Sequence, residues 1–168
     1  LASVATGTLA SAVVFPAGHI LQVQNVQTGA VATGTTTSPG DDTIPQITEG
    51  DEYMTLAITP KNASNILLIN VDIGLISSSL SNTITVALHE GTTANALAAT
   101  LTYRSGADGT RHSTSLMHKM VAGSTSELTF RVRAGGSAAG TTTFNGYSGA
   151  RKLGGVCASS ITIMEIQV

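Results

Sequence analysis

The chain has 168 residues, which suits a single domain, and 42% of them are hydrophobic, enough to bury a core. Only 11% are charged and 4% aromatic, and the frequent Thr, Ser, Ala and Gly favour β structure. The net charge of −2 excludes the basic surface that nucleic acid or an anionic membrane would require, and no stretch approaches the ~20 apolar residues of a membrane span.

Residues 1–17 are predicted to be a connector, and residues 18–168 are predicted to be the folded domain. The connector lacks the positively charged start of a signal peptide, and the chain begins with Leu1 instead of Met. We therefore expect a fragment or a processed product of a longer polypeptide, in which the connector leads into the domain.

Beyond the connector, apolar and polar residues alternate with a period of two, which is typical of β-strands. The run from 66 to 76 is the clearest, with Ile69, Val71 and Ile73 on one face and Asn70 and Asp72 on the other. The Ala-rich stretch 93–101 could pass for a helix, but it is short and flanked by Thr, so a strand is preferred there. In chain order, the predicted strands are 19–28, 53–59, 66–76, 83–89, 97–104, 113–121, 127–133 and 158–167.

Turn residues fill the gaps between these runs, and eight antiparallel strands at this spacing predict an all-β fold, an antiparallel β-sandwich or jelly roll. If the strands alternate in direction, both ends of the domain lie at one end, which we call the proximal end, with the short loops 60–65, 90–96 and 122–126. The long loops 29–52, 105–112 and 134–157 lie at the opposite, distal end. Function on β scaffolds usually resides in long loops, so the distal end is the predicted working surface.

The last strand carries apolar side chains on both faces. Ile161 and Ile163 occupy one face, and Met164 and Ile166 occupy the other. The domain's own core can cover one of these faces. The second face predicts contact with another subunit, because apolar strips of this size are rarely exposed on monomers.

Basic and aromatic residues fall in or beside the distal loops, a combination found at sugar-binding surfaces and at protein interfaces. Tyr147 is the strongest candidate, because the sequence NGYSG places it at a Gly-flanked tip with little to pack against. The alternative is that these side chains are simply exposed. The candidate receptor-binding residues are Tyr147, Arg151, Lys152, Arg104, Arg111 and His112.

Two groups of residues could bind a metal ion, but a solvated or polar role is preferred for both, and no metal or cofactor is expected. His112 and His118 would lie roughly 20 Å apart on one strand, too far to share an ion, although His118 from three subunits could meet on an axis. Acidic residues with the oxygen ligands that Ca²⁺ prefers lie in the first distal loop, at Asp41, Asp42, Glu49, Asp51 and Glu52.

Cys157 has no partner for an intramolecular disulfide and is interpreted as a small buried side chain.

Three segments, taken in order, resemble the C-terminal domain of bacteriophage tail-fibre and related virion proteins: TGTLASAVVFPAGHILQVQNVQT (6–28), ITPKNASNILLINV (58–71) and GARKLGGVCASSITIMEI (149–166). The resemblance implies a homotrimeric jelly roll of the tumour-necrosis-factor-like type, at the end of a shaft to which residues 1–16 belong. It also implies that the first and last strands lie near the three-fold axis. The expected trimer interface consists of Leu21, Val23, Ile161, Ile163, Met164 and Ile166.

The resulting hypothesis is a phage virion structural protein, the trimeric distal domain of a tail fibre that attaches to a host surface glycan or outer-membrane protein. It would lie on the exposed surface of the virion and contact other virion proteins through its N-terminal segment, with no nucleic-acid partner and no membrane insertion. A capsid decoration or head-fibre protein is the alternative, and a tumour-necrosis-factor-like ligand would share the fold. An enzyme acting on polysaccharide would have to use Glu49, Asp51 and Glu52, and no enzymatic activity is expected.

Overall fold

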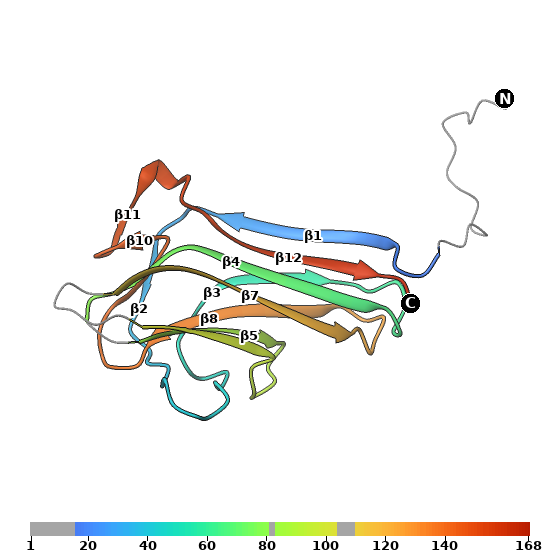
Figure 1. Cartoon of the computed structure of the whole chain (residues 1–168), viewed down its shortest axis with the longest axis horizontal. Helices are drawn as coiled ribbons and strands as arrows, with labels where there is room; N and C mark the ends of the chain where they lie inside the picture. Colours follow the sequence, from blue (N-terminus) through green and yellow to red (C-terminus); the bar gives the residue numbers. More distant parts are fainter. Residues whose placement is uncertain (1–15, 81–82, 104–109) are drawn as a thin grey trace.

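The computed structural model describes residues 16–80, 83–103 and 110–168, and these form an all-β domain (Figure 1). Most of the predicted connector 1–17 and the candidate Arg104 lie outside the described residues. Within the described part, no helix has the length and hydrophobicity needed to cross a membrane. The elements are β1 (Ile20–Thr28), β2 (Ala32–Gly34), β3 (Asp51–Ile58), β4 (Ile66–Ser78), β5 (Ile84–Glu90), β6 (Ala98–Thr102), β7 (Thr110–Val121), β8 (Leu128–Gly136), β9 (Thr142–Phe144), β10 (Gly146–Tyr147), β11 (Ala150–Arg151), η1 (Leu153–Gly155) and β12 (Ser159–Ile166).

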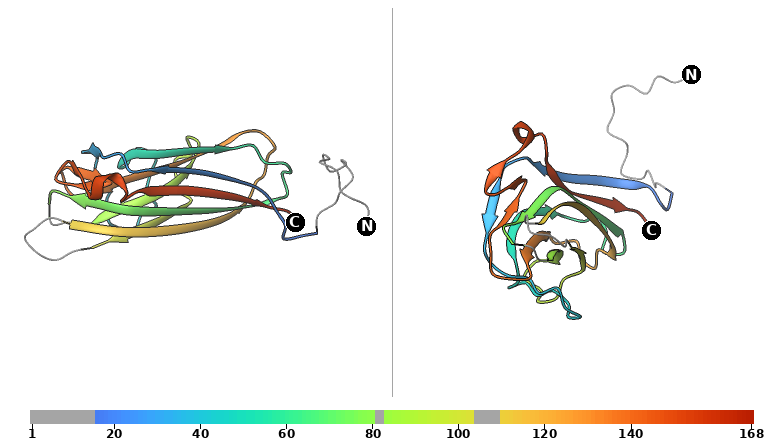
Figure 2. Two further views of the ribbon diagram at one scale, coloured as in Figure 1. Left: turned by 90° about the horizontal axis from the view of Figure 1, so that it is seen from above. Right: turned by 60° about the vertical axis from the view of Figure 1, so that its left-hand side comes forward.

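The long strands pair into two antiparallel sheets. One sheet has the order β1-β12-β4-β7, and near the distal end β9 pairs with β4 on the edge opposite β7, and β2 pairs with β9. The second sheet has the order β3-β8-β5-β6. In chain order, the eight long strands therefore alternate between the sheets, apart from the β5–β6 hairpin. This is a jelly-roll arrangement, and Figure 2 shows the two sheets curving around a common interior.

The predicted fold class, an all-β antiparallel jelly roll, is confirmed. Each of the eight predicted strands has a counterpart, in β1, β3, β4, β5, β6, β7, β8 and β12. The C-terminus and the start of β1 lie at the same end of the domain, as the alternation of strand direction requires (Figure 1). The short strands β2, β9, β10 and β11, all in distal loops, were not predicted.

The core lies between the two sheets and is built from one face of each. Ile69 and Val71 on β4 are fully buried together with Phe130 on β8 and Ile84 on β5. The period-two pattern of β4 explains this placement, because every second side chain of a strand points to the same face.

Ile161 and Ile163, expected at a trimer interface, belong to this core instead. They pair with Val71 and Ile69 across the β12–β4 ladder, and both are 0% exposed within a single chain. Their inclusion in the interface is therefore wrong. The core covers this face of the last strand, whereas Met164 and Ile166 on the opposite face remain half-exposed.

Replacing Phe144 with Ala is expected to lower the free energy of unfolding by about 3–5 kcal/mol, because it removes a large buried side chain and leaves a cavity. The Phe144 ring is 1% exposed and stacks on Tyr53, with ring centroids 4.9 Å apart. Urea denaturation followed by circular dichroism measures the effect. The matched control is Tyr103→Ala at a 69% exposed ring, and an equal loss in both variants would show that burial of Phe144 does not cause the effect.

The first long loop, expected to be a working loop at the distal end, instead folds back over the outer face of the sheet β3-β8-β5-β6. The Ser38 amide donates a hydrogen bond to the Gly136 carbonyl of β8. Residues 45–47 form backbone hydrogen bonds with the β5–β6 connection. Arg133 on β8 holds the loop by donating hydrogen bonds to the carbonyls of Glu49 and Gly50. The loop thus covers this sheet, which the composition of the loop alone did not predict.

Candidate functional site

The sheet β1-β12-β4-β7 has one face in the core and one face that this chain leaves open at its proximal end. The strand register brings the open-face residues side by side. Val23 pairs with Met164, which pairs with Leu68, and Ile166 pairs with both Ile20 and Ile66. We call the following set the outer apolar face: Ile20, Val23, Ile66, Leu68, Met117, Val121, Met164 and Ile166.

The outer apolar face is well exposed, but polar residues interrupt it on β7 and β4, where Lys119 pairs with Leu68 and Asn70 pairs with Met117. Ile20, Val23, Met117 and Val121 are 47%, 52%, 67% and 56% exposed, which is high for large apolar side chains lying on one surface. Toward the distal end, the same face of the four strands becomes polar, with the side chains of Asn25, Gln27, Ser160, Thr162, Asn70, Asp72 and Ser115.

Three of the predicted interface residues, Val23, Met164 and Ile166, lie on this face. Leu21 is half-buried at the β-bulge of β1, next to the face. The sequence prediction missed the contributions of β4 and β7. Those strands were interpreted from their buried side, although the same alternation places Ile66 and Leu68 on the opposite side.

At the distal end, the structure brings together three of the predicted receptor-binding residues. The Arg111 guanidinium carbon lies 3.5 Å from the centroid of the Tyr147 ring, and the Lys152 ammonium lies 5.6 Å from it. Tyr147 is half-buried, so the prediction of a tip with little to pack against is wrong. We call Arg111, Tyr147 and Lys152 the distal cation cluster.

The remaining distal candidates are not placed in this cluster. Arg151 is exposed on β11, where its side chain lies beside Gly155. His112 pairs with the buried Ile76, so its ring lies on the core side of β7, opposite Arg111, with Nε2 buried and unpartnered among the described residues. Its prediction as an exposed receptor-binding residue is therefore wrong.

A small cleft of about 270 Å³, lined mainly by Ser and Thr residues, adjoins the β10–β11 hairpin. The Ser79 hydroxyl accepts a hydrogen bond from the Thr141 amide, and the Thr143 hydroxyl accepts one from the Gly149 amide. The cleft is lined by Ser79, Thr141, Thr143, Ser148 and Gly149.

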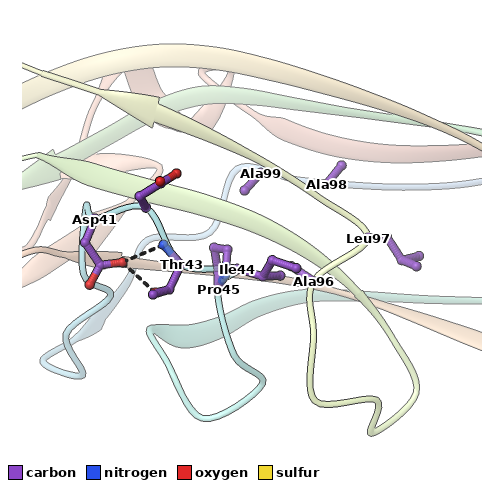
Figure 3. A pocket seen from close by; sticks show the side chains of 9 residues that line it. Asp41, Thr43, Ile44, Pro45, Ala96, Leu97, Ala98 and Ala99 are labelled. Carbon is purple, nitrogen blue, oxygen red and sulfur yellow. Dashed lines mark hydrogen bonds between the residues drawn. The ribbon is translucent and has the colours of Figure 1, made fainter.

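A larger, open groove of about 400 Å³ lies between the first long loop and β6 (Figure 3). Its walls include Ile44, Leu97 and the Ala residues around them. Asp41 lies at one end, but its carboxylate accepts hydrogen bonds from the Thr43 hydroxyl and amide, and these bonds lower the pKa of Asp41. The hydrogen bonds of the Asp41 carboxylate that Figure 3 shows are therefore made within the loop itself.

The acidic residues of the first loop are separated by their own partners. Asp51 accepts hydrogen bonds from Thr36, Glu49 accepts one from the Gln46 amide, and Glu52 forms an ion pair with Arg131 at 2.9 Å. Among the described residues, no group of three or more His, Cys, Asp or Glu side chains could hold a metal ion.

His118 and Cys157 also differ from their expected settings. His118 pairs with the fully buried Ile69, so its ring lies on the core side of β7 and faces away from the outer apolar face, where an axis was expected. Cys157 is a free thiol and is half-buried, in the segment that precedes β12.

A buried carboxylate that the sequence analysis missed joins β12 to the proximal loops. Glu165 is 0% exposed and accepts hydrogen bonds from the Gln22 and Asn65 side chains and the Lys61 and Asn62 amides. Burial by itself would raise the pKa of Glu165, but these hydrogen bonds hold it below its ordinary value of 4.5. The carboxylate therefore fixes the proximal end of the domain, next to the outer apolar face.

Comparison with solved structures finds similarity to a tumour necrosis factor and to a viral structure. The chain is similar to Eiger TNF from S. frugiperda, with a TM-score of 0.43 and 12% identity over 87% of this chain and 92% of that one. It is also similar to a structure of infectious bursal disease virus, Gx strain, with a TM-score of 0.33 and 10% identity over 98% of this chain and 42% of that chain. Neither likeness carries an argument about function. No curated protein matches the chain.

A family model described as the Pgp3 C-terminal domain matches residues 37–168. This match overturns the resemblance to phage tail fibres. The predicted attachment function, the capsid-decoration alternative, the virion partners and the virion location are therefore wrong. Since the match covers most of the chain, the protein belongs to the family of Pgp3 C-terminal domains.

Proposed function

We propose that this chain is a non-catalytic assembly domain that forms a homotrimer through its outer apolar face. The observation that supports the proposal is the face itself, in which eight large apolar residues from four strands lie together at the proximal end. Burial of such side chains between subunits would stabilise the assembly, and Met is enriched at protein interfaces.

A trimer requires each subunit to use two different surfaces, since a ring closes through heterologous contacts. We propose that the outer apolar face of one subunit packs on the next subunit around a three-fold axis near β1 and β12. Val23, Met164 and Ile166 would lie closest to the axis. Met117 and Val121, on the edge strand β7, would then extend the contact away from it.

The absence of catalysis is part of this proposal. The carboxylates of Glu49, Asp51 and Glu52 bind groups of their own chain, so they are not held as an acid and a base across a groove. The host-surface glycan or outer-membrane protein expected as a partner was part of the tail-fibre hypothesis, which the family match contradicts.

The mass of the chain in solution tests the assembly directly. Light scattering over a roughly hundredfold dilution range is expected to give three times 17.0 kDa throughout. A stable dimer would overturn the three-fold arrangement. A monomer at all concentrations would overturn the proposed function as a whole.

A further inference from the structure

The distal cation cluster places two positively charged side chains, Arg111 and Lys152, at the surface of the distal end. Among the described residues, neither Arg111 nor Lys152 forms an ion pair with a carboxylate, whereas Arg131 and Arg133 both approach Glu52. Stacking on Tyr147 holds the flat face of the Arg111 guanidinium and leaves the N–H groups at its edge available for two parallel hydrogen bonds. This geometry suits an oxyanion.

The register of the sheet places the Ser- and Thr-lined cleft next to the cluster. Arg111 pairs with Ser77 on β4, and Ser77 pairs with Thr143 on β9, so the three form one row across the sheet. The β10–β11 hairpin lies over this row, because the Ser77 hydroxyl donates to the Gly146 carbonyl and the Gly149 amide donates to Thr143. Tyr147, between those two glycines, reaches Arg111 from the same hairpin.

The hydroxyl groups of the cleft can donate as well as accept. Ser79 and Thr143 already accept hydrogen bonds from backbone amides, so their hydroxyl hydrogens can point toward a ligand. A row of hydroxyls beside two cations matches a molecule that carries both hydroxyl groups and an acidic group.

The backbone under the cluster has a fixed and uncommon conformation. Asn145 and Ser148 have positive φ angles of 54° and 51°, a region that costs free energy for residues other than Gly. The surroundings hold Asn145 there. Its side chain is fully buried, donates to the carbonyls of Thr28 and Ala30 and accepts from the Ser159 hydroxyl. Because this backbone is already held in one conformation, it would lose little conformational entropy on binding a ligand.

We propose that the distal cation cluster and the adjoining cleft form a binding site for an acidic saccharide. Arg111 and Lys152 bind its carboxylate or sulfate group, and the cleft hydroxyls bind its hydroxyl groups. An acidic peptide would satisfy the two cations, but it would offer the hydroxyls of Ser79 and Ser148 only its backbone groups, whereas a saccharide presents several hydroxyl groups. The site lies at the distal end and does not depend on the trimer interface.

Titration calorimetry on the full chain tests this proposal with three defined probes: a dextran sulfate oligosaccharide, a hyaluronan oligosaccharide and polyglutamate. Binding of either acidic saccharide is expected, and the one that binds identifies the anion. Lys152→Ala should raise its Kd about tenfold, the effect of losing one charge-assisted hydrogen bond. Tyr147→Ala should also weaken binding, although it removes no charge, because Arg111 loses its support.

The control is Lys61→Ala, which removes one exposed positive charge at the proximal end. It should bind the saccharide like the wild type. The proposal is overturned if neither saccharide binds, if polyglutamate binds more tightly than both, or if Lys61→Ala weakens binding as much as Lys152→Ala. The oligomeric mass, measured in the same samples, keeps this result separate from the trimer proposal.

Discussion

Val23→Asp is expected to convert the proposed trimer into monomers. Val23 lies on β1, the edge strand of the outer apolar face beside β12, is 52% exposed in the single chain and pairs with Met164. In the assembly the new carboxylate would be buried without a cation, at a cost of several kcal/mol in each of the three contacts. The single chain should still fold, because the new side chain points away from the core.

The matched control is Val156→Asp, the same substitution at a residue that is 85% exposed in the segment before β12, at the distal end. Light scattering should give a monomer mass for Val23→Asp and a trimer mass for Val156→Asp, with β circular dichroism unchanged in both. A trimer that survives Val23→Asp would show that the outer apolar face is not the interface. Dissociation of both variants would show only a general effect of added negative charge.

Hydrophobic alternation predicted the fold because each long strand of a jelly roll has a core face. In β4, for example, the buried residues Ile69 and Val71 recur with a period of two. The same pattern did not reveal which face of β12 is covered by the chain itself. That depends on pairing with β4, which is distant in the sequence, so Ile161 and Ile163 were assigned to the wrong surface.

The distal site was predicted in part, for a similar reason. Arg111, Tyr147 and Lys152 were chosen by residue type and loop position, and the structure does bring them together. His112 was chosen in the same way, but strand pairing turns its ring toward the core. Residue type can indicate candidates for a charged surface. The side of the sheet on which each residue lies, however, depends on strand pairing in the tertiary structure.

The three segments that resemble phage tail fibres form neighbouring strands of one sheet, and this explains why the resemblance was misleading. Residues 6–28, 58–71 and 149–166 supply β1, the start of β4 and β12, three strands that lie side by side in one sheet. Their likeness to another protein therefore described a packing arrangement. Many unrelated functions share such an arrangement, so the likeness could report the fold but not the role of the protein.

Glu165→Gln is expected to lower the free energy of unfolding by about 2–4 kcal/mol at neutral pH. The carboxylate accepts four hydrogen bonds while fully buried, and the amide of Gln would direct its own N–H groups toward at least one of these donors. The control is Glu127→Gln at an exposed residue of the β7–β8 connection, which should leave stability within about 0.5 kcal/mol of the wild type.

The effect of Glu165→Gln should depend on pH with a definite sign. The pKa of Glu165 is lower in the folded chain than its ordinary value of 4.5, so the stabilisation is complete above that value and is lost as the pH falls through the folded-state pKa. Urea denaturation at one protein concentration should therefore show a constant difference between wild type and variant from pH 7 to about pH 5, which narrows toward about pH 3. A difference that stays constant down to pH 3 would mean that the amide perturbs packing alone. A difference that widens on acidification would mean that Glu165 is protonated in the folded state, and the buried carboxylate would not be what fixes the proximal end.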